Sequence, residues 1–184
     1  MGTELRKIGR VLGARWVASS YQSLLAIWSS YNTLYAHSSE SSSLPGNGKH
    51  KSTYHGIRQA LQFKELLHSP AVMLDALKEV SKLSKALQAD NCSLSKTYQL
   101  LRGTIKALQN QKEGHGSYFQ EYLCAETAGN FRGIKLLPRE SMLCKEAFLQ
   151  AIIDNLSTRF DENVGVTSNV TFNRLLTSFD VLDS

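Results

Sequence analysis

The feature that most constrains the fold is a row of large side chains at helical spacing near the N-terminus. Six of them recur at steps of three or four residues, namely Val17, Tyr21, Leu24, Trp28, Tyr31 and Tyr35. Because an α-helix completes a turn in 3.6 residues, this spacing places all six on one face. The sequence therefore predicts a helix from Arg15 to His37 whose aromatic face belongs to a protein core.

Further helices follow from similar signals. Ser69 and Pro70 predict the start of a helix whose outer face carries charged residues, Asp75 among them, and Ser93 predicts the start of the next. The short link 89–92 between these two helices predicts antiparallel packing. The remaining predicted helices cover residues 54–67, 117–127, 141–159 and 171–179, the helix over 141–159 directing Leu149, Ile152, Ile153, Leu156 and Phe160 inward.

Two stretches lack helical periodicity. The serines, Pro45 and the glycines between residues 38 and 52 predict a flexible loop, and Gly129, Gly133 and Pro138 predict an irregular segment. The predicted domain organisation is a basic N-terminal segment, residues 1–14, followed by a helical bundle over residues 15–184. The fold class is all-α, an irregular helical bundle.

Composition agrees with this class. The chain has 184 residues with 42% hydrophobic residues and only three prolines, which suits one helical domain. It has neither an apolar run long enough to span a membrane nor a signal peptide, so we expect an intracellular protein. The three cysteines, Cys92, Cys124 and Cys144, are then expected to be reduced and mostly buried.

The net charge of +5 is concentrated in the first third of the chain. The basic side chains there are Arg6, Lys7, Arg10, Arg15, Lys49, Lys51, Arg58 and Lys64. Such a region attracts nucleic acid or another acidic partner, or it is simply a solvated surface. Charge alone leaves both interpretations open.

The sequence shows no complete catalytic, metal or cofactor site. The cysteines and histidines lack metal-ligand spacing, Gly9 and Gly13 lack the lysine of a phosphate loop, and no serine or cysteine is paired with a base. The acidic candidates for acid–base or metal chemistry are Glu121, Glu126, Asp154, Asp161 and Glu162, and we interpret them as solvated charges. We therefore expect no enzyme, no metal, no cofactor and no small-molecule substrate.

One motif points to a family. Arg15 and Trp16, followed by Val17-Ala18-Ser19, begin the first predicted helix, and the C-terminal stretch 175–183 contains Phe179 and then Val-Leu-Asp. These stretches resemble the hAT superfamily of transposases, in particular its host-domesticated vertebrate branch of zinc-finger and SUMO-ligase-like relatives. The likeness spans most of the chain but is carried by these two short motifs.

The resemblance implies that the chain is the all-helical insertion domain of a ribonuclease-H-like hAT transposase. The family's first two catalytic aspartates would then lie upstream of Met1 and its glutamate downstream of Ser184, which leaves no catalytic residue in this chain. In active relatives the tryptophan stacks near a flipped base, a role that carries over only to Trp16 with its neighbour Arg15. Active elements commonly have Asn-Ser-Thr after the tryptophan, so Val17-Ala18-Ser19 fits the domesticated branch and puts DNA chemistry in doubt.

Three functions follow as hypotheses. The leading one is a non-catalytic interaction module of hAT-like origin in the nucleus, with DNA, other nuclear proteins or a second copy of the chain as partners. The second is a DNA-binding fragment in which Arg15, Trp16, Arg10 and Lys7 contact phosphates and a stacked base. The third is a generic helical adaptor, in which Trp16 merely packs at the helix entrance.

Overall fold

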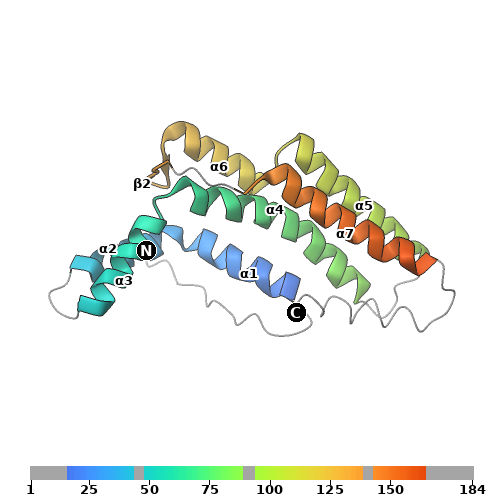
Figure 1. Ribbon diagram of the computed structural model, residues 1–184, viewed down its shortest axis with the longest axis horizontal. Coiled ribbons are helices and arrows are strands. Elements are labelled where there is room, and N and C mark those ends of the chain that lie inside the picture. The colour runs from blue at the N-terminus through green and yellow to red at the C-terminus, as the bar shows by residue number, and fades with distance from the viewer. Residues whose placement is uncertain (1–15, 44–47, 89–93, 139–142, 165–184) are drawn as a thin grey trace. The chain divides into compact units, whose positions relative to one another are not determined.

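The computed structural model describes residues 16–43, 48–88, 94–138 and 143–164 (Figure 1). In chain order the elements are α1 (Trp16–Ser29), α2 (Tyr31–Ser43), α3 (Gly48–Ala60), α4 (Lys64–Leu87), α5 (Leu94–Glu113), α6 (Ser117–Ala128), β1 (Asn130–Phe131), β2 (Ile134–Lys135) and α7 (Lys145–Val164). The described chain is mostly helical, which confirms the predicted all-α class. No helix in these ranges is long and apolar enough to cross a bilayer.

The described residues form two compact units. The first combines Gln22–Leu74 with Gly116–Leu143, and the second combines Asp75–His115 with the described residues at 16–21 and from 144 onward. Each unit has its own core: the most deeply buried large side chains are Tyr31, Leu67, Leu74 and Tyr122 in the first, and Leu83, Thr97, Leu108 and Leu149 in the second. The described residues of both units fall within the region 15–184 that the sequence predicts as a helical bundle, and its bounds stay a prediction.

The first predicted helix is interrupted at Ser30. Helix α1 ends at Ser29 and α2 begins at Tyr31, although the Ser30 amide still donates to the Ala26 carbonyl at 3.0 Å. The predicted core face is confirmed at three positions, because Val17, Trp28 and Tyr31 are buried. The other three members, Tyr21, Leu24 and Tyr35, are half-buried.

The loop predicted for residues 38–52 is wrong where the structure describes it. Helix α2 continues to Ser43 and α3 begins at Gly48, and residues 44–47 lie outside the described ranges. The serine hydroxyls are satisfied inside the helix: Ser38 Oγ donates to the Leu34 carbonyl at 2.6 Å and Ser43 Oγ to the Ser39 carbonyl at 2.9 Å. Serine has a helix propensity only a few tenths of a kcal/mol below that of better formers, so a serine-rich helix is sustained by packing.

The helix start predicted at Ser69 and Pro70 is also wrong, because α4 begins six residues before the proline, at Lys64. The Lys64 amide donates to the Leu137 carbonyl at 3.0 Å, which satisfies a donor at the true helix start. Proline in a helix interior costs about 3 kcal/mol. Complete burial of Leu67 and Leu74 offsets this cost, at about 1.5–3 kcal/mol for each leucine.

The segment predicted to be irregular contains a small antiparallel hairpin. Strands β1 and β2 pair in the register Asn130↔Lys135 and Phe131↔Ile134. Arg132 and Gly133 form the connection with φ values of 50° and 86°. Two successive residues with positive φ are typical of a type I′ hairpin turn.

In the second unit, α5 and α7 lie side by side (Figure 1). Leu149, Ile153 and Leu156 of α7 are buried, as predicted, but the helix begins at Lys145 rather than Ser141, and Leu143 and Cys144 are not helical. Gln111 near the end of α5 donates from Nε2 to the Asp75 carbonyl of α4 at 3.2 Å, which agrees with the predicted antiparallel pair. The predicted helix over 171–179 lies outside the described residues.

Three side chains differ from their predicted exposure. Asp75 belongs to the predicted solvated face of α4 but is buried, with 4% of its surface exposed. Cys124 and Cys144 were expected to be buried and are exposed free thiols. Cys92 lies outside the described residues.

Candidate functional site

Of the four residues predicted to contact DNA, only Trp16 lies within the described chain. Trp16 is the first residue of α1, and its side chain is not described. Arg15, Arg10 and Lys7 precede the described residues. Their role therefore stays a prediction.

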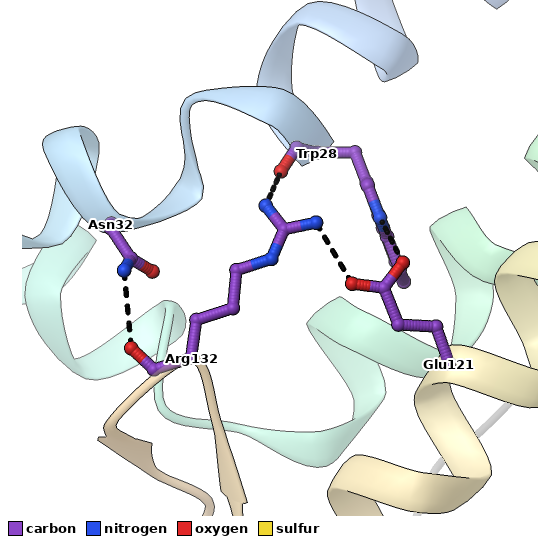
Figure 2. Close-up of polar contacts among 4 residues, drawn as sticks. All are labelled: Trp28, Asn32, Glu121 and Arg132. Carbon is purple, nitrogen blue, oxygen red and sulfur yellow. Dashed lines mark hydrogen bonds and ion pairs between the residues drawn. The ribbon is translucent and has the colours of Figure 1, made fainter. Parts of the chain in front are cut away.

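Two of the carboxylates interpreted as solvated are instead engaged in specific contacts within the first unit. Glu121 belongs to a group formed with Trp28, Asn32 and Arg132, which we call the Arg132 network (Figure 2). Glu126 belongs to a second group, formed with Lys64, His68 and Tyr122, which we call the Glu126 cluster. Both acids are thus ion-paired, although their side chains remain 41% and 35% exposed.

The Arg132 network joins the hairpin turn to three helices, α1, α2 and α6. Arg132 Nη1 donates to the Trp28 carbonyl at 2.7 Å, and Nη2 forms an ion pair with Glu121 Oε1 at 2.8 Å. The other carboxylate oxygen of Glu121 accepts the Trp28 indole N–H at 3.0 Å. The Arg132 carbonyl in turn accepts from Asn32 Nδ2 at 3.1 Å. As Figure 2 shows, these bonds tie the turn of the hairpin to α6 and to both helices that flank Ser30.

The network explains an arginine at an unfavourable backbone position. A non-glycine residue in the left-handed region costs about 1–2 kcal/mol. A hydrogen bond from a charged donor contributes about 1.5–3 kcal/mol, so the side-chain bonds of Arg132 outweigh this strain. Its guanidinium also lies 4.6 Å from the centroid of the Phe131 ring, a favourable cation–π distance.

The Glu126 cluster lies between α4 and α6. Lys64 and His68 are four residues apart on α4, as are Tyr122 and Glu126 on α6, so each pair shares one helix face. Lys64 Nζ is 3.1 Å from Glu126 Oε1, and the His68 ring packs edge-on against Tyr122 at a centroid distance of 5.1 Å. Tyr122, 2% exposed, is hydrogen-bonded to Glu126 through its side chain.

Burial and hydrogen bonding shift the pKa values in opposite directions here. Burial raises the pKa of Glu126, but the hydrogen bonds from Lys64 and Tyr122 and the nearby positive charge outweigh it, so the pKa lies below its usual value. Burial, followed by the Glu126 carboxylate, raises the pKa of the Tyr122 hydroxyl well above its usual range. The cluster thus holds Glu126 ionised and Tyr122 neutral.

This shift predicts a pH dependence of stability. The pKa of Glu126 is lower in the folded state than in the unfolded state. Its contribution to the free energy of unfolding is therefore fully present above the unfolded-state pKa and is lost as the pH falls through the folded-state pKa. We expect Glu126→Gln to lower the free energy of unfolding at neutral pH and to flatten its decrease between about pH 5 and about pH 3. Urea unfolding across this range checks the prediction, and equal slopes for the wild type and the variant would contradict it.

The second unit holds a buried cation at a helix end. Lys145, 9% exposed, donates from Nζ to the carbonyls of Gln111 at 3.1 Å, Lys112 at 3.3 Å and Gly114 at 3.0 Å. These carbonyls belong to the C-terminal end of α5, where the helix dipole favours a positive charge. The first residue of α7 therefore caps α5.

Comparisons with protein-family models, with curated proteins and with solved structures find no match to this chain. Within the described ranges, no three histidine, cysteine, aspartate or glutamate side chains form a group that could hold a metal. The geometry of the polar clusters is therefore the main guide to their role. In each cluster the acid is paired with a cation and the contacts join different elements, which is the arrangement of a structural network.

Sequence reasoning missed Arg132 and Lys145. Gly133 is a local signal for a turn. Nothing in the neighbouring sequence indicates that the Arg132 side chain bonds to the carbonyl of Trp28, 104 positions earlier. Lys145 has no local signal at all, because its partners lie between 31 and 34 positions earlier.

Proposed function

We propose that this chain is a non-catalytic interaction module of hAT-transposase-like origin that acts through nuclear protein or DNA contacts. The observation that supports this proposal best is that two of the candidate catalytic carboxylates are paired with cations of the same unit. Glu121 is paired with Arg132 and Glu126 with Lys64, so each acid is neutralised by a cation of its own unit. Carboxylates held in this way contribute to the fold, whereas a general acid–base pair or a metal site needs them directed at a substrate.

The other acids support the same proposal. Asp154 is exposed on α7 and accepts a hydrogen bond from Gln150 Nε2 at 2.7 Å, four residues earlier. Asp161 and Glu162 belong to the same helix, but their side chains lie outside the described part of the chain.

The second candidate function is DNA binding at the start of α1. Trp16 is the first residue of this helix, so the predicted DNA contact would lie at a helix N-terminus. Helix N-termini favour phosphate because the unpaired amides and the dipole attract negative charge. Arg10 and Lys7 would add phosphate contacts, and Trp16 would stack on a base.

The DNA contact predicts a specific defect in one variant. We expect the wild type to bind a labelled DNA hairpin at low salt, and Trp16→Ala to bind about tenfold more weakly, because one base–aromatic stack contributes about 1–3 kcal/mol. Fluorescence anisotropy at two salt concentrations measures both effects. Lys135→Ala, at an exposed lysine of β2, is the control for a general loss of charge. A folded wild type that does not bind at low salt would remove the DNA contact and leave protein partners.

A further inference from the structure

Helix α3 is unusually open to solvent. None of its described residues is buried, and Tyr54 and Arg58, which lie on one face, are half-buried. That face is directed at α2, because the two helices lie side by side and the Tyr54 ring packs edge-on against His37 at 5.5 Å (Figure 1). The contact with α2 leaves the remaining surface of α3 exposed.

Basic side chains form a row along the boundary between this exposed surface, which carries Lys51 and His55, and the face towards α2, on which Arg58 is half-buried. Lys51, His55 and Arg58 follow one another at steps of four and three residues, and we call them the basic row. The 13 residues of α3 include no aspartate or glutamate. Lys51 and Arg58 are two turns apart, which corresponds to about 10.5 Å along the helix axis. The helix itself therefore provides no acidic side chain to neutralise the row.

Arg58 adds an unsatisfied donor to this row. Its Nε atom is buried and has no hydrogen-bond partner among the described residues. A buried donor without an acceptor costs about 1–3 kcal/mol. A carboxylate is the acceptor that best matches a guanidinium, and its binding at the edge of the helix would draw the arginine side chain outward.

We infer that the basic row is a docking surface for an acidic helix of a protein partner. A partner helix with carboxylates at i, i+4 and i+7 has the same spacing as the basic row, seven residues or about two turns from the first charge to the last. Each carboxylate can therefore pair with one basic side chain of the row. The inference names a partner class for the interaction module proposed above and rests on that proposal, but it concerns α3 and not the start of α1.

Nucleic acid fits this surface less well. The basic row has only two permanent cations, Lys51 and Arg58, whereas a protein on duplex DNA commonly makes about 6–10 phosphate contacts. Binding of single strands relies on aromatic rings that stack on bases. The aromatic residue of α3, Tyr54, is half-buried and already packs against His37.

A peptide titration tests the inference. The probe is a labelled helical peptide of about 15 residues, long enough to cover α3, with glutamates at i, i+4 and i+7. We expect saturable, salt-sensitive binding in fluorescence anisotropy, and Lys51→Glu to weaken it about tenfold because an attractive pair becomes repulsive. The matched control is Lys135→Glu, the same charge change at an exposed lysine of the same unit, which should alter the affinity about twofold or less.

A charge swap sharpens the test. A peptide with lysines in place of the three glutamates should bind Lys51→Glu more tightly than it binds the wild type. Equal weakening by Lys51→Glu and Lys135→Glu, or no saturable binding to a wild type that is folded by circular dichroism, would overturn the inference. So would a DNA duplex that binds more tightly than the peptide and loses its affinity in Lys51→Glu. If only the peptide fails while Trp16-dependent DNA binding persists, the inference is wrong and the proposed function stands.

Discussion

Replacing Lys145 by methionine is expected to give the largest loss of stability, about 3 kcal/mol in the free energy of unfolding. Methionine keeps the unbranched shape of the side chain but removes the ammonium that bonds to the carbonyls of Gln111, Lys112 and Gly114. Each carbonyl left without a donor costs about 1–3 kcal/mol, and the lost charge at a helix C-terminus adds up to about 2 kcal/mol. Removing the apolar methionine side chain from water recovers part of this sum.

Urea unfolding followed by far-UV circular dichroism measures the effect of Lys145→Met. The matched control is Lys106→Met, the same substitution at an exposed lysine of α5, which should change the stability by no more than about 0.5 kcal/mol. Hydrogen exchange should also become faster at the C-terminal end of α5 in Lys145→Met. Equal stabilities for the two variants would show that the buried ammonium does not cap the helix.

Arg132→Ala is expected to cost about 2–3 kcal/mol. Most of the loss comes from the charged bond to the Trp28 carbonyl, because Trp28 is 3% exposed and its carbonyl lies beside the interruption at Ser30. The ion pair with Glu121 contributes less, since the two side chains are 34% and 41% exposed. Alanine also retains the strain of a positive φ, which its small side chain does nothing to offset.

Two companion variants separate these contributions in the same unfolding experiment. Arg132→Gly removes the same side chain but adopts a positive φ freely, so it should be about 1 kcal/mol more stable than Arg132→Ala. Glu121→Gln weakens the ion pair yet keeps an acceptor for the Trp28 indole, so its loss should stay below about 1 kcal/mol. A free energy of unfolding for Arg132→Ala within about 0.5 kcal/mol of the wild type would contradict the structural role of the network.

The parts of the fold that could be predicted are those encoded in local periodicity. The buried face of α7 and the core positions Trp28 and Tyr31 follow from side chains three or four residues apart, and the start of α6 follows from the glycines at 114 and 116. Helix boundaries were predicted less well where tertiary contacts determine them. Pro70 resembles a helix start, but the bond from Lys64 to Leu137 and the burial of leucines on both sides of the proline move the start earlier.

The polar clusters could not be predicted because their contacts are between residues far apart in sequence. Glu121 accepts a hydrogen bond from Trp28, 93 positions earlier, and Arg132 donates one to the Trp28 carbonyl, 104 positions earlier. Nothing in the spacing around Glu121 or Glu126 distinguishes a paired acid from a solvated one. The serines of α2 were misinterpreted for a related reason: a hydroxyl that donates within its own helix, as Ser38 does, has the same sequence signature as one in a loop.

The central claim is that the chain binds partners and does not catalyse, its acids serving the fold. The most direct test incubates a labelled DNA hairpin with Mg²⁺ or Mn²⁺ and the wild type or Glu121→Gln, and resolves the DNA on a denaturing gel. We predict intact hairpin with both proteins at every time point. Cleavage by the wild type that disappears in folded Glu121→Gln would contradict the account and make Glu121 a catalytic acid.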